Sequence, residues 1–129
     1  MTPELAALAA TAFIHLIAVG WSQKCLTDDI GKDGNVAPRD GDLDLSVLTN
    51  RLRRALANHT ENIGPFIIAV VLVEFTDSNG WLTAIAAWVF VAARALYLPA
   101  YAFGWVPWRS LIYTIGLVAT FAMIGRSLF

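Results

Sequence analysis

Three polar residues, Arg54, Asn58 and Glu61, are spaced by four and three in a segment that runs directly into an apolar stretch. This spacing places the three side chains on one face of a helix. Arg can bind a carboxylate bidentately, an Asn amide both donates and accepts hydrogen bonds, and Glu can orient an Arg or accept from an ammonium group. The segment therefore predicts a binding face for a water-soluble anionic ligand.

A second polar face follows later in the chain. Arg94, Tyr97 and Tyr101 are spaced by three and four, so they also share one face of a helix. Arg109 and Tyr113, four apart in the next predicted helix, add a third wall. Together the three walls predict a polar pocket in which an anionic ligand meets a lipid-soluble one.

The same residues also allow purely structural roles. Glu61 with Arg94 could be an intramembrane ion pair that fixes helix register, and Asn58 a hydrogen bond between helices. We expect Arg51 to bind the ligand, although an Arg at this depth also suits lipid headgroups. The Tyr residues of the second face also suit an interfacial aromatic belt. His15 is expected to bond a neighbouring helix.

The elements that carry these residues are predicted to be membrane helices. With 57% hydrophobic residues and a mean hydropathy of +0.60, a chain of 129 residues is too apolar for a soluble domain of this size. A spanning helix needs roughly 20 residues, which four apolar runs reach with their flanks. The runs are Leu5–Trp21, Ile63–Phe75, Trp81–Phe103 and Leu111–Ile124. We therefore expect an all-α fold, a single domain over residues 1–129 built as an integral membrane four-helix bundle.

Local signals mark the ends of these helices. Thr2 is an expected N-cap followed by Pro3 at the first helical position, and Asp44 or Ser46 can start the second helix after a Gly- and Asp-rich loop over residues 28–42. Two further tight turns are expected, at residues 77–80 and 104–107.

Charge and cysteine content exclude several classes of protein. A net charge of -1, without a basic stripe, argues against nucleic acid as a partner. Cys25 is the only cysteine, so an internal disulfide is not possible. Glu4 precedes the first run without any Lys or Arg, which does not fit a cleaved signal peptide.

The distribution of positive charge predicts the orientation. Six of the nine Lys and Arg residues lie in or beside the first connection: Lys24, Lys32, Arg39, Arg51, Arg53 and Arg54. By the positive-inside rule this connection should be cytoplasmic, with both termini on the opposite face. The protein is thus expected to be a multi-pass protein, of the inner or plasma membrane if its host is bacterial.

Residue depth can be compared by counting from the turn between Phe75 and Trp81. Glu61 lies 14 residues before Phe75 and Arg94 lies 13 residues after Trp81, so antiparallel helices would place the two at the same height. The predicted pocket then lies near the cytoplasmic interface.

The spaced polar residues resemble those of a known family. The pattern comprises Arg54-Ala55, Asn58, Glu61 and Pro65-Phe66, then Arg94 with Tyr101, then Arg109-Ser110 with Tyr113. Over nearly the whole chain it resembles the membrane-associated proteins in eicosanoid and glutathione metabolism, the MAPEG family. Members include microsomal glutathione transferases, leukotriene C4 synthase, microsomal prostaglandin E synthase and the non-catalytic five-lipoxygenase-activating protein.

The resemblance implies a homotrimer with glutathione bound between neighbouring subunits on the cytoplasmic side. It implies that these residues hold the tripeptide: Arg54, Asn58, Glu61, Arg94, Tyr97, Tyr101 and Tyr113. Arg109 would stabilise the thiolate, with Ser110 as its hydrogen-bond partner. Ala57 stands where the prostaglandin E synthase has a basic residue, so specific eicosanoid synthesis is not inferred.

We therefore expect a membrane glutathione transferase or peroxidase that acts on lipophilic electrophiles arriving from the bilayer. The alternative is a non-catalytic lipid-binding or scaffold protein of the same fold, and a third hypothesis is a small transporter that uses Glu61 and Arg94. The expected partners are glutathione, a lipophilic substrate, membrane lipids and two further copies of the chain. No metal is expected.

Overall fold

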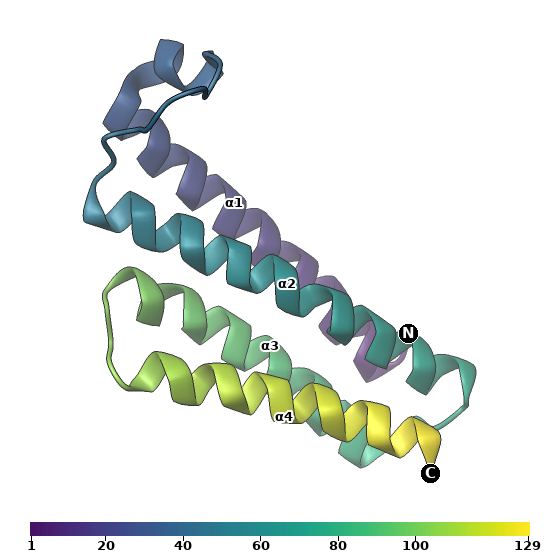
Figure 1. Cartoon of the computed structure of the whole chain (residues 1–129). Helices are drawn as coiled ribbons and strands as arrows, with labels where there is room; N and C mark the ends of the chain where they lie inside the picture. Colours follow the sequence, from purple (N-terminus) through teal and green to yellow (C-terminus); the bar gives the residue numbers. More distant parts are fainter.

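Four long helices make up most of the chain in the computed structural model, which describes residues 1–129. They are α1 (Pro3–Val36), α2 (Val47–Phe75), α3 (Trp81–Ala102) and α4 (Trp108–Leu128). Successive helices run in opposite directions, and both termini lie at the same end of the bundle as the α2–α3 turn (Figure 1). All four helices are long and apolar enough to cross a membrane. The prediction of an all-α bundle of four apolar helices is confirmed.

Most helix ends follow the local signals. Thr2 Oγ1 accepts a hydrogen bond from the Leu5 backbone N–H at 3.2 Å, so Thr2 caps α1 as predicted. Ser46 Oγ accepts from the Thr49 N–H, also at 3.2 Å, which makes Ser46 rather than Asp44 the cap of α2. The two predicted tight turns separate α2 from α3 and α3 from α4.

The first connection is shorter than predicted. The sequence predicts a loop over residues 28–42, but α1 continues to Val36 and only residues 37–46 are not helical. Gly31 explains the difference, because its φ of 74° and ψ of 171° are not helical, so it kinks the chain between two helical segments that together form α1. Across this break Asn35 Nδ2 donates to Thr27 Oγ1 at 2.8 Å. The Gly and Asp residues therefore mark a kink in the helix.

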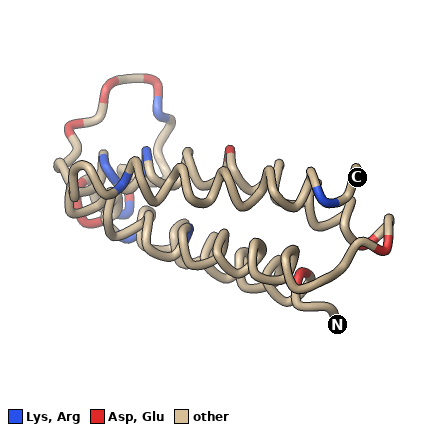
Figure 2. The backbone as a smooth tube through the Cα atoms, turned by 90° about the horizontal axis from the view of Figure 1, so that it is seen from below, with Lys and Arg blue, Asp and Glu red and all other residues tan.

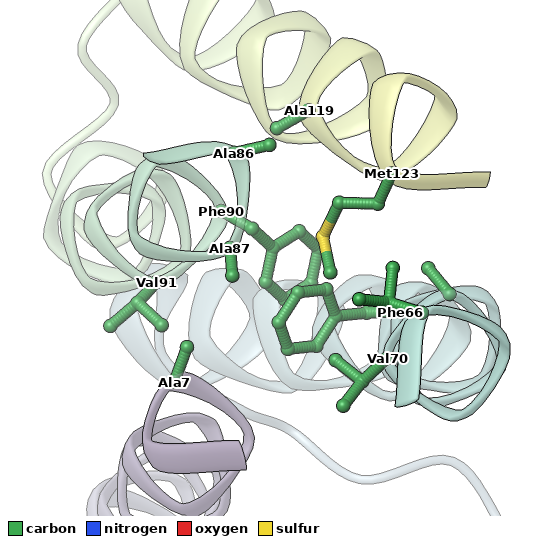
Figure 3. Close-up of a cluster of buried hydrophobic side chains, with 11 residues drawn as sticks. Ala7, Phe66, Val70, Ala86, Ala87, Phe90, Val91, Ala119 and Met123 are labelled. Atoms are coloured by element: carbon green, nitrogen blue, oxygen red, sulfur yellow. The ribbon is translucent and has the colours of Figure 1, made fainter. Parts of the chain in front are cut away.

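The core lies between all four helices. Phe66 of α2 and Phe90 of α3 stack at its centre, with ring centroids 3.9 Å apart (Figure 3). Ala7 of α1, Ala87 of α3 and Ala119 of α4 belong to the same cluster. Small residues at these positions let helix backbones approach closely, which is how helices associate in lipid.

Away from the core, the helices expose large apolar side chains. Phe13, Leu16 and Phe121 are each more than 60% exposed. In water so much apolar surface would favour aggregation, whereas in a bilayer it contacts acyl chains. The surface agrees with a multi-pass membrane protein.

A polar cluster, here called the terminal cluster, ties together the end of the bundle that holds both termini. It consists of Thr2, Glu4, Glu74, Asn79 and Thr83. The carboxylate of Glu4 is 1% exposed and accepts hydrogen bonds from the Thr83 hydroxyl and, at 3.2 Å, from Asn79 Nδ2. Glu74 accepts from the Thr2 hydroxyl and from Asn79. These bonds join the start of α1 to the α2–α3 turn.

Candidate functional site

Arg94 is buried in the middle of the bundle and is only 1% exposed. Its Nη1 donates to Asn58 Oδ1 of α2 at 3.2 Å. Its Cζ lies 5.5, 5.0 and 5.6 Å from the ring centroids of Phe90, Tyr97 and Tyr113, respectively. Ring faces attract a cation, but they do not neutralise its charge. Arg94 is therefore a buried positive charge enclosed by α2, α3 and α4.

Beside Arg94, a cleft of about 350 Å³, here called the polar cleft, opens between α2, α3 and α4. Its lining residues are Asn58, Tyr97, Tyr101, Arg109, Ser110, Tyr113 and Thr114. Six of the ten residues predicted for the site are in this lining, and Arg94 contacts three of them. The polar faces predicted on three separate helices therefore meet in one place. Its volume is within the range of small-molecule sites.

Arg109 is the one positively charged residue in the lining of the polar cleft. Its guanidinium Cζ lies 5.0 Å from the Tyr101 ring centroid. No carboxylate pairs with it, because the only salt bridge in the structure joins Lys24 and Asp28 of α1. An Arg side chain stays charged in proteins, so a cleft lined by one such cation and several Tyr hydroxyls, with Arg94 buried beside it, is suited to an anionic ligand.

The Tyr side chains also pack against one another. The ring centroids of Tyr97 and Tyr101 are 5.6 Å apart, and those of Tyr97 and Tyr113 are 6.4 Å apart. Thr114 completes the lining and was not predicted as a site residue. The sequence could have indicated it, because Thr114 lies four residues after Ser110 and the two side chains therefore share one face of α4.

The ion pair of Glu61 with Arg94, which the sequence left open as a structural role, is not formed within the single chain. Glu61 is exposed on the surface of α2, and Arg94 bonds to Asn58 instead. Counting residues from the turn gives height along the bundle but not the direction in which a side chain points, and Asn58 occupies the inward position on α2. The transporter hypothesis loses the ion pair on which it was based.

Two other predicted residues, Arg51 and Arg54, also lie outside the lining of the polar cleft. Arg51 Nη1 donates to the Ala102 carbonyl at 3.4 Å, and a Cβ on Gly104 would lie 3.0 Å from that nitrogen. Arg51 therefore ties the start of α2 to the turn between α3 and α4. Arg54 is exposed on α2, as Glu61 is.

A buried histidine pair lies behind the site. His59 of α2 is 3% exposed, and its ring stacks on His15 of α1 with centroids 5.6 Å apart and planes 19° apart. The sequence predicts a bond from His15 to a neighbouring helix, and the observed contact is ring stacking, with Nδ1 left without a hydrogen-bond partner. His59 was not predicted, although it directly follows Asn58 in the polar segment of α2.

The largest hollow in the structure is an apolar groove of about 650 Å³ between α1 and α2. Its lining residues are Leu5, Leu8, Ala9, Thr11, Ala12, His15, Leu16, Thr60, Ile63 and Ile67. The wall is mostly aliphatic, with two hydroxyls and one imidazole. Such a surface suits the hydrocarbon part of a lipophilic molecule.

Comparison with known proteins identifies the family but no individual relative. Neither the curated proteins nor the solved structures that were searched gave a match. The family model described as MAPEG family matches residues 5–129, which is essentially the whole chain. This match agrees with the four apolar helices and with the resemblance of the polar residues. The chain therefore belongs to the MAPEG family.

Proposed function

We propose that this protein is a membrane-bound, glutathione-dependent transferase or peroxidase that acts on lipophilic electrophiles. The observation that carries the proposal is the polar cleft, where Arg109, Ser110 and three Tyr residues meet beside the buried Arg94. Glutathione is an anionic tripeptide, and both Arg residues lack a carboxylate partner within the protein. The chemistry of the cleft therefore fits this ligand.

Arg109 is proposed to hold the sulfur in its ionised form. A free thiol titrates near pH 8.5 and only the thiolate is a strong nucleophile. A nearby guanidinium favours the thiolate, and lowering the pKa by two units corresponds to about 2.7 kcal/mol. Ser110, next in the chain, would donate a hydrogen bond to the sulfur. When bound, glutathione supplies the nucleophile that forms an S–C bond as the leaving group departs with its electron pair.

The remaining residues are proposed to bind and orient the tripeptide. Arg94 and Asn58 would face one of its carboxylates, and the Tyr hydroxyls of the cleft would donate hydrogen bonds. Arg54 and Glu61 are exposed on α2, so we place them at a subunit interface of a homotrimer. There Glu61 of one subunit would accept from the ammonium group of a ligand held by the next.

The polar cleft is proposed to open toward the cytoplasm. Its lining residues come from α2 after the first connection and from the two helices that flank the α3–α4 turn. Lys and Arg residues gather at that end of the bundle, together with acidic residues (Figure 2). The positive-inside rule assigns such an end to the cytoplasm. Glutathione would then enter from water, and the lipophilic electrophile would enter from the bilayer.

The test is turnover of purified protein with glutathione and an aryl halide or a lipid hydroperoxide. We expect Arg109→Ala to lower the rate by about 10²- to 10³-fold, the usual effect of removing one group that stabilises developing negative charge. The matched control is Arg126→Ala, which removes an exposed Arg from the last turn of the same helix and should leave the rate unchanged. Equal turnover in wild type and Arg109→Ala would contradict the proposal.

A lipid-binding protein without catalysis is the second candidate, and the apolar groove favours it. At about 650 Å³ the groove is larger than the polar cleft. This function predicts that fatty acids raise the midpoint of thermal unfolding whereas glutathione does not. Protection by glutathione that is lost in Arg94→Ala would reject it.

A further inference from the structure

The turn between α3 and α4 is held against the start of α2 by the side chain of Arg51. Arg51 Nη1 donates a hydrogen bond to the Ala102 carbonyl at 3.4 Å, and the guanidinium packs beside Gly104. A Cβ on Gly104 would lie 3.0 Å from Arg51 Nη1 and 3.1 Å from both Cζ and Nη2. The φ of Gly104 is 68°, a conformation that suits Gly because it has no Cβ. Gly104 therefore both makes the turn and leaves the room that Arg51 fills.

The turn in turn connects two side chains of the polar cleft. Tyr101 precedes the turn and Arg109 follows it, and both line the cleft. The Gly104 N–H donates to the Tyr101 carbonyl at 3.2 Å, and the Arg109 N–H donates to the Trp105 carbonyl at 3.1 Å. The Arg109 Cζ lies 5.0 Å from the Tyr101 ring centroid, so this contact closes over the turn. Its geometry therefore depends on the path of residues 103–107.

Little else fixes the Arg109 side chain. The only salt bridge in the structure is elsewhere, and a ring face attracts a cation without fixing its direction. The turn also touches α1, where the ring centroids of Trp21 and Phe103 are 6.2 Å apart, but this contact involves no hydrogen bond. The contact with Arg51 is the one side-chain hydrogen bond to this part of the chain. The place of Arg109 therefore depends on how Arg51 holds the turn.

We propose that Arg51 is a positioning residue, which sets the place of Arg109 at the polar cleft by holding the α3–α4 turn against the start of α2. The sequence predicts that Arg51 binds the ligand, but in the structure Arg51 is outside the lining of the cleft and contacts the turn. The consequence for the thiol of glutathione rests on the proposed function, whereas the position of Arg109 does not.

The experiment uses arginine labelled with ¹⁵N in the detergent-solubilised full chain, without any ligand. The Nε–H signal of Arg109, assigned by its loss in Arg109→Lys, is sensitive to the nearby Tyr101 ring, and Tyr101→Leu gives the signal without that ring. We expect Arg51→Ala to move the signal toward its Tyr101→Leu value. Arg51→Lys keeps a donor for the Ala102 carbonyl and should give a signal between those of wild type and Arg51→Ala. If Arg51→Ala does not fold, Arg51→Gln, which lacks the guanidinium, decides the outcome.

Two controls separate positioning from a general loss of stability. Arg53→Ala removes an exposed Arg from the same helix, and Val73→Ala removes buried volume from the core cluster. Neither should move the Arg109 signal. An Arg109 signal that is unchanged in Arg51→Ala would overturn the inference, and so would an equal shift in Val73→Ala.

The bound thiol gives a second measurement on the same variants. Displacing the Arg109 guanidinium removes a charge that favours the thiolate, so we expect Arg51→Ala to raise the pKa of bound glutathione by about half a unit. The ultraviolet absorbance of the thiolate, followed as the pH is varied, measures this change, and Arg53→Ala should show none. If the Arg109 signal moves as expected but wild type binds no glutathione, the proposed function fails and the positioning role stands. If wild type turns over glutathione and Arg51→Ala changes neither the signal nor the pKa, the positioning role fails and the proposed function stands.

Discussion

Buried polar groups are fully hydrogen-bonded in the terminal cluster, whereas near the polar cleft several buried nitrogens have no partner. In the terminal cluster Glu4 is as deeply buried as Arg94, and both of its carboxylate oxygens accept hydrogen bonds, from Thr83 and Asn79. Near the polar cleft, Arg94 has one hydrogen bond, two unpaired nitrogens and no carboxylate partner. The two sites therefore do not differ in burial. They differ in how completely their buried polar atoms are hydrogen-bonded.

The difference distinguishes structural from functional polar residues. A fully paired cluster stabilises the fold and fixes how the helices meet. An unpaired buried cation lowers stability unless something else compensates it, and an anionic ligand is such a compensation. This comparison supports a structural role for the terminal cluster and the proposal that the polar cleft binds an anionic ligand.

The sharpest test of this comparison is Arg94→Met, a replacement of similar length without charge. We expect glutathione affinity to fall by about 100-fold, roughly 2.7 kcal/mol, while stability against unfolding in sodium dodecyl sulfate stays the same or rises. Calorimetry and unfolding monitored by circular dichroism measure the two effects. A large loss of stability together with unchanged affinity would make Arg94 a structural residue and remove the contrast.

In the terminal cluster, Glu4→Ala should lower stability and leave glutathione affinity unchanged, which is the reverse of the result expected for Arg94→Met. Its removal takes one of two acceptors from each of Thr83 and Asn79, so we expect stability to fall by about 0.5 to 1.5 kcal/mol with no change in glutathione affinity. The same two measurements apply. Glu4→Gln, which retains one acceptor oxygen, should lose less stability. Unchanged stability in Glu4→Ala would mean that the terminal cluster does not hold the bundle together.

The smallest expected effect comes from Gly116→Ala. The added methyl would lie 3.1 Å from Arg94 Nη2 and 3.4 Å from the Ala93 side chain, so the guanidinium must shift by a few tenths of an ångström. We expect affinity for glutathione to weaken about threefold, near 0.6 kcal/mol. Gly125→Ala on the same helix meets nothing within 4 Å and serves as the control. Equal affinities in the two variants would show that the cleft tolerates movement of Arg94.

The sequence predicted the helices and the meeting of polar residues in one place better than it predicted individual contacts. Apolar runs and the caps at Thr2 and Ser46 were sufficient for the four helices, because membrane helices are defined by length and composition. Helical spacing also placed Asn58, Tyr97 and Tyr113 correctly on faces that meet.

Contacts between helices were harder to predict, because they depend on rotation about each helix axis. Glu61 and Arg94 were expected at one height, but Glu61 points outward. The stacking of His15 on His59 depends on how α1 rotates against α2, which no local pattern encodes. The extent of α1 past Asp28 was missed because a helical segment resumes after the kink at Gly31, whose positive φ interrupts the helix at one residue.

The most direct test of the central claim, that the polar cleft binds an anionic thiol, is a calorimetric titration of the detergent-solubilised protein. Glutathione is compared with its diethyl ester, which keeps the thiol but lacks both carboxylates. We predict saturable binding of glutathione and at least tenfold weaker binding of the ester, because the unpaired Arg side chains attract carboxylates. No binding of glutathione, or equal affinity for the two compounds, would contradict the account.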